Sequence, residues 1–271
     1  MTEVKSDSGK QTKVNQTQEW PLSPRTSENL QDDERRALEK AKDYWKISED
    51  LYSESTEWKV AKESEFIQIS STYCESLNLT IFKVKCVMNQ NWARALDVLL
   101  DYPSCPSWND TCETCELVMD LSSPLDSIET TLDPTKERSA WVAYMRMSDS
   151  VSRMISKRDF CTCFLMEKGQ DHALYVGTGA DVVACPPLKK CVRGEQSILA
   201  VKIEKIDEDS CVMTQLASIN FKGMLFQTLV DLSMVKALNT FAQCLRDHAN
   251  SLSADQNQNS ENHHKIPGKK L

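Results

Sequence analysis

Between residues 58 and 220 the chain carries a long succession of strand-like segments, with helix-like segments before and after it. Each strand-like segment is either β-branched and apolar or alternates between polar and apolar residues, which is the pattern of a β-strand. We predict strands at residues 58–61, 66–73, 79–88, 116–121, 128–132, 139–147, 160–166, 172–178, 192–206 and 211–220. Strands grouped in this way between helices are typical of an α+β fold, in which helices cover an antiparallel sheet.

Three segments have the three- and four-residue apolar spacing of amphipathic helices. The first begins at Asp32 with an acidic turn, and the second follows Asn91, which can cap it, and ends before Pro103. The third is a long helix over residues 224–248, whose apolar surface is wide enough to pack against a sheet. We expect only a turn at residues 105–110.

Both ends of the chain are polar. Residues 1–31 are rich in Gln, Ser, Thr and Lys, and residues 251–271 in Asn, Gln, Ser, His and Lys. Such composition cannot bury enough apolar surface to order a chain, so we predict two disordered tails. Between them, residues 32–250 form one domain of the common size of roughly 200 residues.

The charge of the chain excludes some partners. The formal net charge is −8, and no long basic run lies inside the predicted domain, so we expect no contact with nucleic acid. The first ten residues lack the apolar centre of a signal peptide, and no run of eighteen apolar residues occurs. We therefore expect a cytoplasmic protein.

Cysteine and glycine usage narrows the chemistry. The eleven cysteines are an odd number and many lie among apolar residues, so we interpret them as small buried side chains in a reducing compartment and not as a disulfide framework. The seven glycines are far fewer than the usual share of about 7 per cent. Folds that depend on glycine-rich phosphate loops are disfavoured.

Short motifs recur along the domain in a recognisable order. They are Trp58-Lys59-Val60, residues 79–86, Asp97-Val98-Leu99-Leu100-Asp101, Trp108-Asn109, Arg158-Asp159-Phe160, Cys185-Pro186-Pro187 followed by Val192-Arg193-Gly194, and Asn220-Phe221-Lys222-Gly223. Together they resemble the START (StAR-related lipid-transfer) family over residues 32–250. The resemblance implies a helix-grip fold, in which a curved antiparallel sheet of about nine strands wraps around a long C-terminal helix and leaves a tunnel for one lipid.

The chain departs from the family pattern just before the last helix. Asn220 stands where the family has Asp, and Met224-Leu225-Phe226 replaces the usual Trp-Leu-Pro. This segment is closer to the START domains attached to acyl-CoA thioesterases.

The resemblance also places the tunnel. Some sterol-binding members carry a buried acid and an arginine at the positions of Met145 and Phe164, so both charges are absent here. Because strand side chains alternate, the rest of each face follows from these two positions. We predict that the ligand contacts Trp141, Ala143, Met145, Met147, Phe160, Thr162, Phe164 and Met166 from the strands, and Leu225, Phe226, Leu229 and Val230 from the last helix. The same stripes also suit a filled core without a cavity.

Residues that could carry catalysis or a metal are scarce. His172 and His248 are the only histidines inside the domain, and neither lies beside a nucleophile in the sequence pattern. Cys112 and Cys115 could bind one side of a zinc ion. Cys161 and Cys163 could supply the other ligands, but on a strand they should both face away from the tunnel. Cys105 is the only other thiol nearby in sequence. We expect no enzyme, no cofactor and no metal. Arg158-Asp159 is interpreted as a structural pair at the base of a loop.

These observations give one functional hypothesis and two alternatives. The chain binds one lipid (a sterol, a phospholipid or a fatty acyl species) in the tunnel and carries or senses it, as a monomer that touches membranes transiently. The gate is expected at residues 148–157 and at the start of the last helix, residues 224–230. The alternatives are a helix-grip enzyme or cyclase, and an interaction module whose pocket is closed.

Overall fold

The computed structural model describes residues 25–26, 28–53, 55–127, 135–148, 157–222 and 227–263. The elements in order are α1 (Asp32–Tyr52), β1 (Lys59–Glu63), β2 (Ile67–Cys74), β3 (Leu79–Met88), α2 (Trp92–Leu100), α3 (Cys105–Trp108), β4 (Cys112–Asp120), a 3₁₀ helix (Ser123–Ser127), β5 (Glu137–Met147), β6 (Arg158–Lys168), β7 (His172–Gly179), β8 (Val192–Arg193), β9 (Glu195–Lys205), β10 (Cys211–Asn220) and α4 (Gln227–His263).

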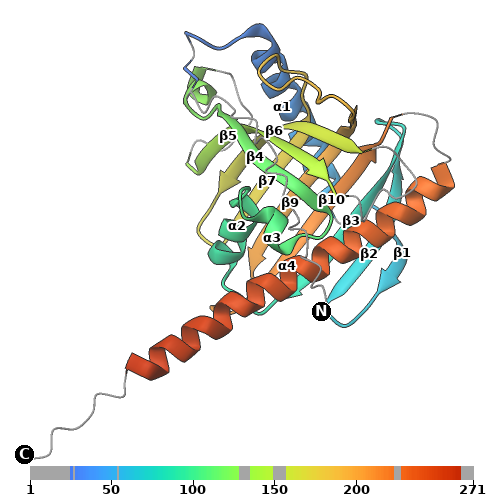
Figure 1. The fold of residues 1–271 in the computed structure, drawn as a ribbon. Coiled ribbons are helices and arrows are strands. Elements are labelled where there is room, and N and C mark those ends of the chain that lie inside the picture. The colour runs from blue at the N-terminus through green and yellow to red at the C-terminus, as the bar shows by residue number, and fades with distance from the viewer. Residues whose placement is uncertain are drawn as a thin grey trace, which may run out of the picture.

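One curved sheet contains all the described strands (Figure 1). Its order is β1-β2-β3-β10-β9-β7-β6-β5-β4, with antiparallel neighbours throughout, and β8 pairs in parallel with β6. The last strand of the chain therefore lies inside the sheet, between β3 and β9. This is the α+β helix-grip architecture that the sequence predicted.

The two faces of the sheet are covered by different helices. Helix α1 contacts β6, β7 and β9, whereas α4 contacts β2 and β3 and packs with α2 and α3 (Figure 1). Each face has its own apolar core, one beneath α1 and the other on the side of α2 and α4. Because side chains alternate along a strand, one strand contributes to both cores in turn.

Several local predictions are confirmed. Helix α1 begins at Asp32, where Gln31 and Glu34 form a capping box. Helix α2 is capped by Asn91, whose Oδ1 accepts a hydrogen bond from the Ala93 amide at 3.0 Å.

Other local predictions need correction. The turn predicted at residues 105–110 contains the one-turn helix α3, and β4 begins at Cys112 rather than at residue 116. The strand predicted at residues 192–206 is divided at Gly194, whose amide donates to the Asp159 carbonyl at 2.9 Å. The chain changes partner strands there, because β8 pairs with β6 whereas β9 pairs with β7 and β10.

Some predicted segments lie outside the described residues, and one predicted boundary differs from the structure. The strand predicted at residues 128–132 lies outside the described residues, as do residues 149–156 and 224–226 of the predicted gate. Helix α4 continues to His263, beyond the tail boundary predicted at residue 250.

Arg158 and Asp159 each hold a separate loop at the base of the sheet. The Arg158 guanidinium donates to the carbonyls of Phe221 and Lys222, directly before α4. The fully buried Asp159 accepts from Arg193 Nε at 3.1 Å and from Arg193 Nη2 at 3.2 Å, and also from the Leu188 amide at 3.1 Å.

We predict that Asp159→Asn lowers the free energy of unfolding by about 2–4 kcal/mol, because breaking a buried ion pair leaves its partner uncompensated. Urea denaturation measures the change. Glu204→Gln is the control, since Glu204 and Lys202 form an exposed pair at 2.7 Å, and its effect should stay below about 1 kcal/mol. Equal effects of the two substitutions would refute the structural role of Asp159.

Candidate functional site

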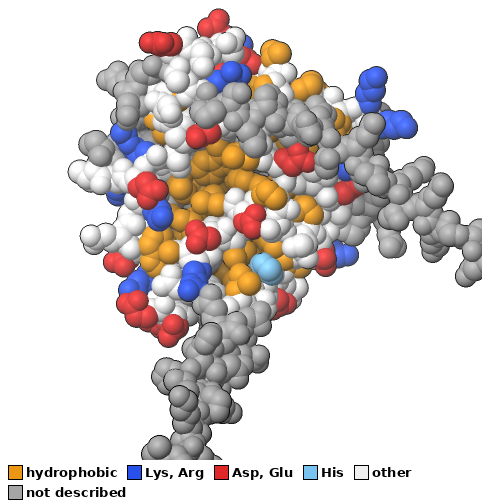
Figure 2. Space-filling model, turned by 60° about the vertical axis from the view of Figure 1, so that its left-hand side comes forward, with side chains coloured by type: hydrophobic (Ala, Val, Ile, Leu, Met, Phe, Trp, Pro, Cys, Tyr) orange, Lys and Arg blue, Asp and Glu red, His pale blue; other side chains and the backbone are white. Residues whose placement is uncertain are grey.

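A cavity lies between the concave face of the sheet and helices α2, α3 and α4. Its volume is about 160 Å³. One water needs roughly 10–15 Å³ by this measure, so the space equals that of about ten waters. Figure 2 shows the face that bears α2 and α3, where apolar side chains gather in the middle and charged side chains surround them. The sequence had left open a filled core, and the cavity removes that alternative.

Six of the predicted ligand contacts line this cavity. They are Ala143, Met145, Met147, Phe160, Thr162 and Phe164. The strand register explains why they converge, since Met145 lies opposite Phe160, and Ala143 lies opposite Thr162, on the paired strands β5 and β6. On the other face of β6, Cys161 and Cys163 belong to the core beneath α1, as the alternation predicted.

Two predicted contacts, Trp141 and Met166, lie in the same apolar core but do not line the cavity. The Trp141 indole is held against the wall, because its Nε1 donates to the Tyr102 hydroxyl at 2.7 Å and its ring stacks on Phe164 with centroids 5.3 Å apart. Gly177 permits this arrangement, since a Cβ there would lie 2.3 Å from Cε1 of Phe164.

The predicted contacts on the last helix are less fully placed. Val230 is half-buried and packs against the core without lining the cavity. Leu225 and Phe226 lie outside the described residues, and the side chain of Leu229 is also not described. The helical wall is instead formed further along α4, by Met234, Ala237, Leu238 and Phe241.

Sequence reasoning missed the contribution of β9 and β10. On β10 the cavity is lined by Gln215, Ala217 and Ile219, which alternate along the strand. A signal was present, because Gln215 is a single polar residue in an otherwise apolar alternating row. From the start of β9, Gln196 also lines the cavity.

No charged side chain is among the described residues that line the cavity. Its polar groups are few, and most have partners. The Thr162 hydroxyl donates to Oε1 of Gln196 at 2.5 Å. Gln215 is only 7% exposed, and its Oε1 is buried with no hydrogen-bond partner among the described residues. Leaving a buried acceptor unpaired costs about 1–3 kcal/mol.

Helix α3 closes one part of the cavity wall. Trp108 on α3 contacts Phe241 of α4, with ring centroids 6.0 Å apart, and stacks on His248 of α4 at 5.8 Å. His248 and His172 are absent from the cavity lining, so neither histidine of the domain faces it.

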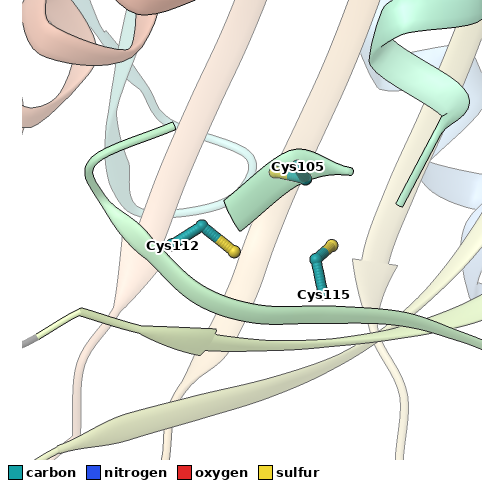
Figure 3. Close-up of side chains that lie close together, drawn as sticks. All are labelled: Cys105, Cys112 and Cys115. Carbon is teal, nitrogen blue, oxygen red and sulfur yellow. The ribbon is translucent and has the colours of Figure 1, made fainter. Parts of the chain in front are cut away.

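Three cysteines lie together in this wall (Figure 3). The Sγ atoms of Cys105 on α3 and of Cys112 and Cys115 on β4 lie within 4.8 Å of one another. The pKa of Cys105 is lowered because the Cys112 and Cys115 thiols lie beside its sulfur, which also accepts a hydrogen bond from the Asn109 amide. The pKa of Cys112 is raised to about 12, because the neighbouring Cys105 sulfur and burial favour its neutral thiol. Sequence reasoning had considered Cys161 and Cys163 as the second half of such a group, and the structure brings in Cys105 instead.

Among the helices of the described part of the chain, none combines the length and the apolar character needed to cross a bilayer.

Several solved structures share this architecture. Human StAR-related lipid transfer protein 5 superimposes with a TM-score of 0.67 at 15% identity, covering 81% of this chain and 99% of that one. Human STARD10 gives a TM-score of 0.59 at 18% identity, covering 82% and 84% of the two chains. The human StarD13 (DLC2) lipid transfer and protein localization domain gives 0.55 at 12% identity, covering 75% and 94%. At these identities the likeness shows the fold alone.

The sequence itself supplies the family. The model of the START domain matches residues 29–251, which include every strand of the sheet and the part of α4 that packs on it. The chain therefore belongs to the START domain family.

Proposed function

We propose that this chain binds one neutral lipid bearing a hydroxyl group in the cavity and carries it through the cytosol as a monomer, with transient contact to membranes. The observation that carries the proposal is an apolar cavity whose described lining has no charged side chain. Transfer of ten methylenes from water into such a space contributes about 8 kcal/mol, at about 0.8 kcal/mol each. That energy suffices for holding a lipid without any covalent step.

The absence of charge in this lining separates the candidate lipids. A phosphate or a carboxylate buried there would lose its hydration without a cationic partner, which costs several kcal/mol. A sterol or another lipid whose only polar group is a hydroxyl has no such cost. A phospholipid or a free fatty acid is therefore a poorer fit than a sterol.

The unpaired amide of Gln215 supports the same class. A ligand hydroxyl can donate a hydrogen bond to Oε1. Pairing of the buried oxygen recovers the free energy that its isolation costs. Since Met145 and Phe164 replace the acid and the arginine of some sterol-binding relatives, we propose that Gln215 is the polar anchor of the ligand.

Substitution of Met145 tests whether the cavity is the binding site. We predict that Met145→Arg reduces bound lipid at least tenfold, because it adds a charge to the lining, whereas Met145→Leu retains it. The measurement is uptake of a fluorescent sterol from vesicles, together with mass spectrometry of lipid extracted from the purified protein. Equal uptake by both variants would place the ligand elsewhere. If the wild-type protein reproducibly contains no lipid and takes up none, the result would instead favour an interaction module whose pocket is closed.

Substitution of Gln215 tests the anchor. We predict that Gln215→Leu raises the free energy of unfolding of the lipid-free protein by about 1–3 kcal/mol, since it removes an unpaired buried acceptor. The same variant should lose the preference for a sterol over its 3-methyl ether, in which the hydroxyl proton is absent.

Gln196→Leu is the matched control for Gln215→Leu. Gln196 also lines the cavity, but its oxygen is paired with Thr162, so this variant should destabilise the protein. Thermal unfolding and competitive sterol binding measure the two effects. An unchanged preference in Gln215→Leu, or a loss of stability equal to that of the control, would disprove the role of the anchor.

A further inference from the structure

Two of the three clustered cysteines, Cys112 and Cys115, face the same side of β4. A regular strand would not place both on one side. Cys112 and Cys115 are three residues apart, and in an unbroken strand such residues point to opposite faces. The pairing of β4 with β5 is irregular between Cys112 and Thr114, so one extra residue interrupts the alternation. This bulge turns both thiols to the same side, toward Cys105 on α3 (Figure 3).

The bulge is held from its other side by charge. The extra residue, Glu113, accepts from Arg146 Nη2 at 3.1 Å and from Lys157 Nζ at 2.9 Å. Bulges of this kind re-aim side chains and are a built feature of a strand. The direction of the two thiols is therefore supported by contacts that involve neither sulfur.

The donor set is made of sulfur and suits a soft cation. Cys112 lies opposite Met147 and Cys115 lies opposite Met145 on β5, so the neighbouring residues on that strand also carry sulfur. In a tetrahedral zinc site, with bonds of about 2.3 Å, the sulfurs are about 3.8 Å apart. The three sulfurs already lie within 4.8 Å of one another, so they need to approach by only about 1 Å. Hard cations such as Mg²⁺ and Ca²⁺ require oxygen ligands, which this group does not offer.

We propose that Cys105, Cys112 and Cys115 form a binding site for one thiophilic cation, Zn²⁺, with three thiolate ligands and a fourth position that faces the cavity. Two of the ligand residues, Cys105 and Cys115, line the cavity, which gives the fourth position its direction. The site uses none of the residues assigned to lipid binding and does not depend on that assignment.

Binding involves no change of oxidation state. Three Zn–S bonds replace three S–H bonds, three protons pass to the solvent, and the complex carries a net charge of −1. The hydrogen bond from Cys112 Sγ to the Thr114 carbonyl, 3.3 Å long, is lost in the process. The hydrogen bond that Asn109 Nδ2 donates to Cys105 Sγ, 3.5 Å long, can remain and stabilise the thiolate.

Such an ion would connect α3 to β4. Because Trp108 of α3 packs on α4, the ion would also fix the position of the helix that covers the cavity. Ions that bind only the folded state stabilise it, so melting temperature should rise with the concentration of the metal.

Cadmium titration of the reduced, chelator-treated full chain tests the site, because thiolate bound to Cd²⁺ gives an ultraviolet charge-transfer band that imidazole does not. We expect one Cd²⁺ per chain at the amplitude of three thiolates, reduced only by a large excess of Zn²⁺, and a rise in melting temperature. Cys115→Ser and Cys105→Ser should each weaken binding about 100-fold or more, because even partners outside the ligand set are worth 10–100-fold. Cys74→Ser, at the end of β2, is the control and should bind as the wild type does.

Several outcomes would overturn the proposal. They are a reduced wild type that gives no stoichiometric thiolate band, a band of equal strength in Cys105→Ser, and Cd²⁺ bound without that band, which would indicate the histidines His263 and His264. A disulfide among the three cysteines that persists in reductant would also overturn it. Cys105 is the least buried of the three, so Cys105→Ala remains informative if a substitution on β4 prevents folding.

Discussion

Burial of both faces of β6 determines much of this structure. Ten of its eleven residues are buried, so neither face of the strand meets solvent. One face packs beneath α1, and the other forms part of the cavity wall. A strand in this position must be apolar on both faces. Beneath α1 the side chains form an apolar core, whereas on the concave side they line a cavity and leave part of the space open.

The open side depends on shape more than on chemistry. The sheet curves around α4. Small side chains such as Ala143 and Ala217 leave open space in the cavity that larger side chains would fill. Where a large ring is present, it is held back. The Phe164 ring lies over Gly177 and against Trp141, and Trp141 is tied in turn to Tyr102. The cavity is thus maintained by contacts within its own wall.

The fold and one wall of the site could be predicted from the sequence, because alternation indicated the strands and the family resemblance implied the helix-grip form and the place of the tunnel. The faces of β5 and β6 are regular, so counting in twos from Met145 and Phe164 identified six lining residues. Trp141 and Met166 were predicted as contacts by the same count, but the count cannot tell that a hydrogen bond or a neighbouring ring keeps a side chain in the wall.

Alternation failed where the strands are irregular or where the wall is not a strand. The bulge in β4 places Cys112 and Cys115 on one side against their spacing, and no local pattern indicates that α3 brings Cys105 beside them. The change of partner strand at Gly194 was also not indicated, because the strand pattern was taken to run unbroken from residue 192 to residue 206. Gln215 is different, because its row was visible in the sequence and only its isolation required the structure.

The position of β10 has a consequence for synthesis of the protein. This strand separates β3 from β9, yet it is the last strand that leaves the ribosome. Until it is inserted, β3 and β9 are both unpaired edges, which are templates for pairing with other chains. A nascent chain that stops near residue 210 would carry two such edges and an uncovered apolar sheet, so we expect it to need a chaperone. The hollow for a ligand can exist only after β10 and α4 have been synthesised.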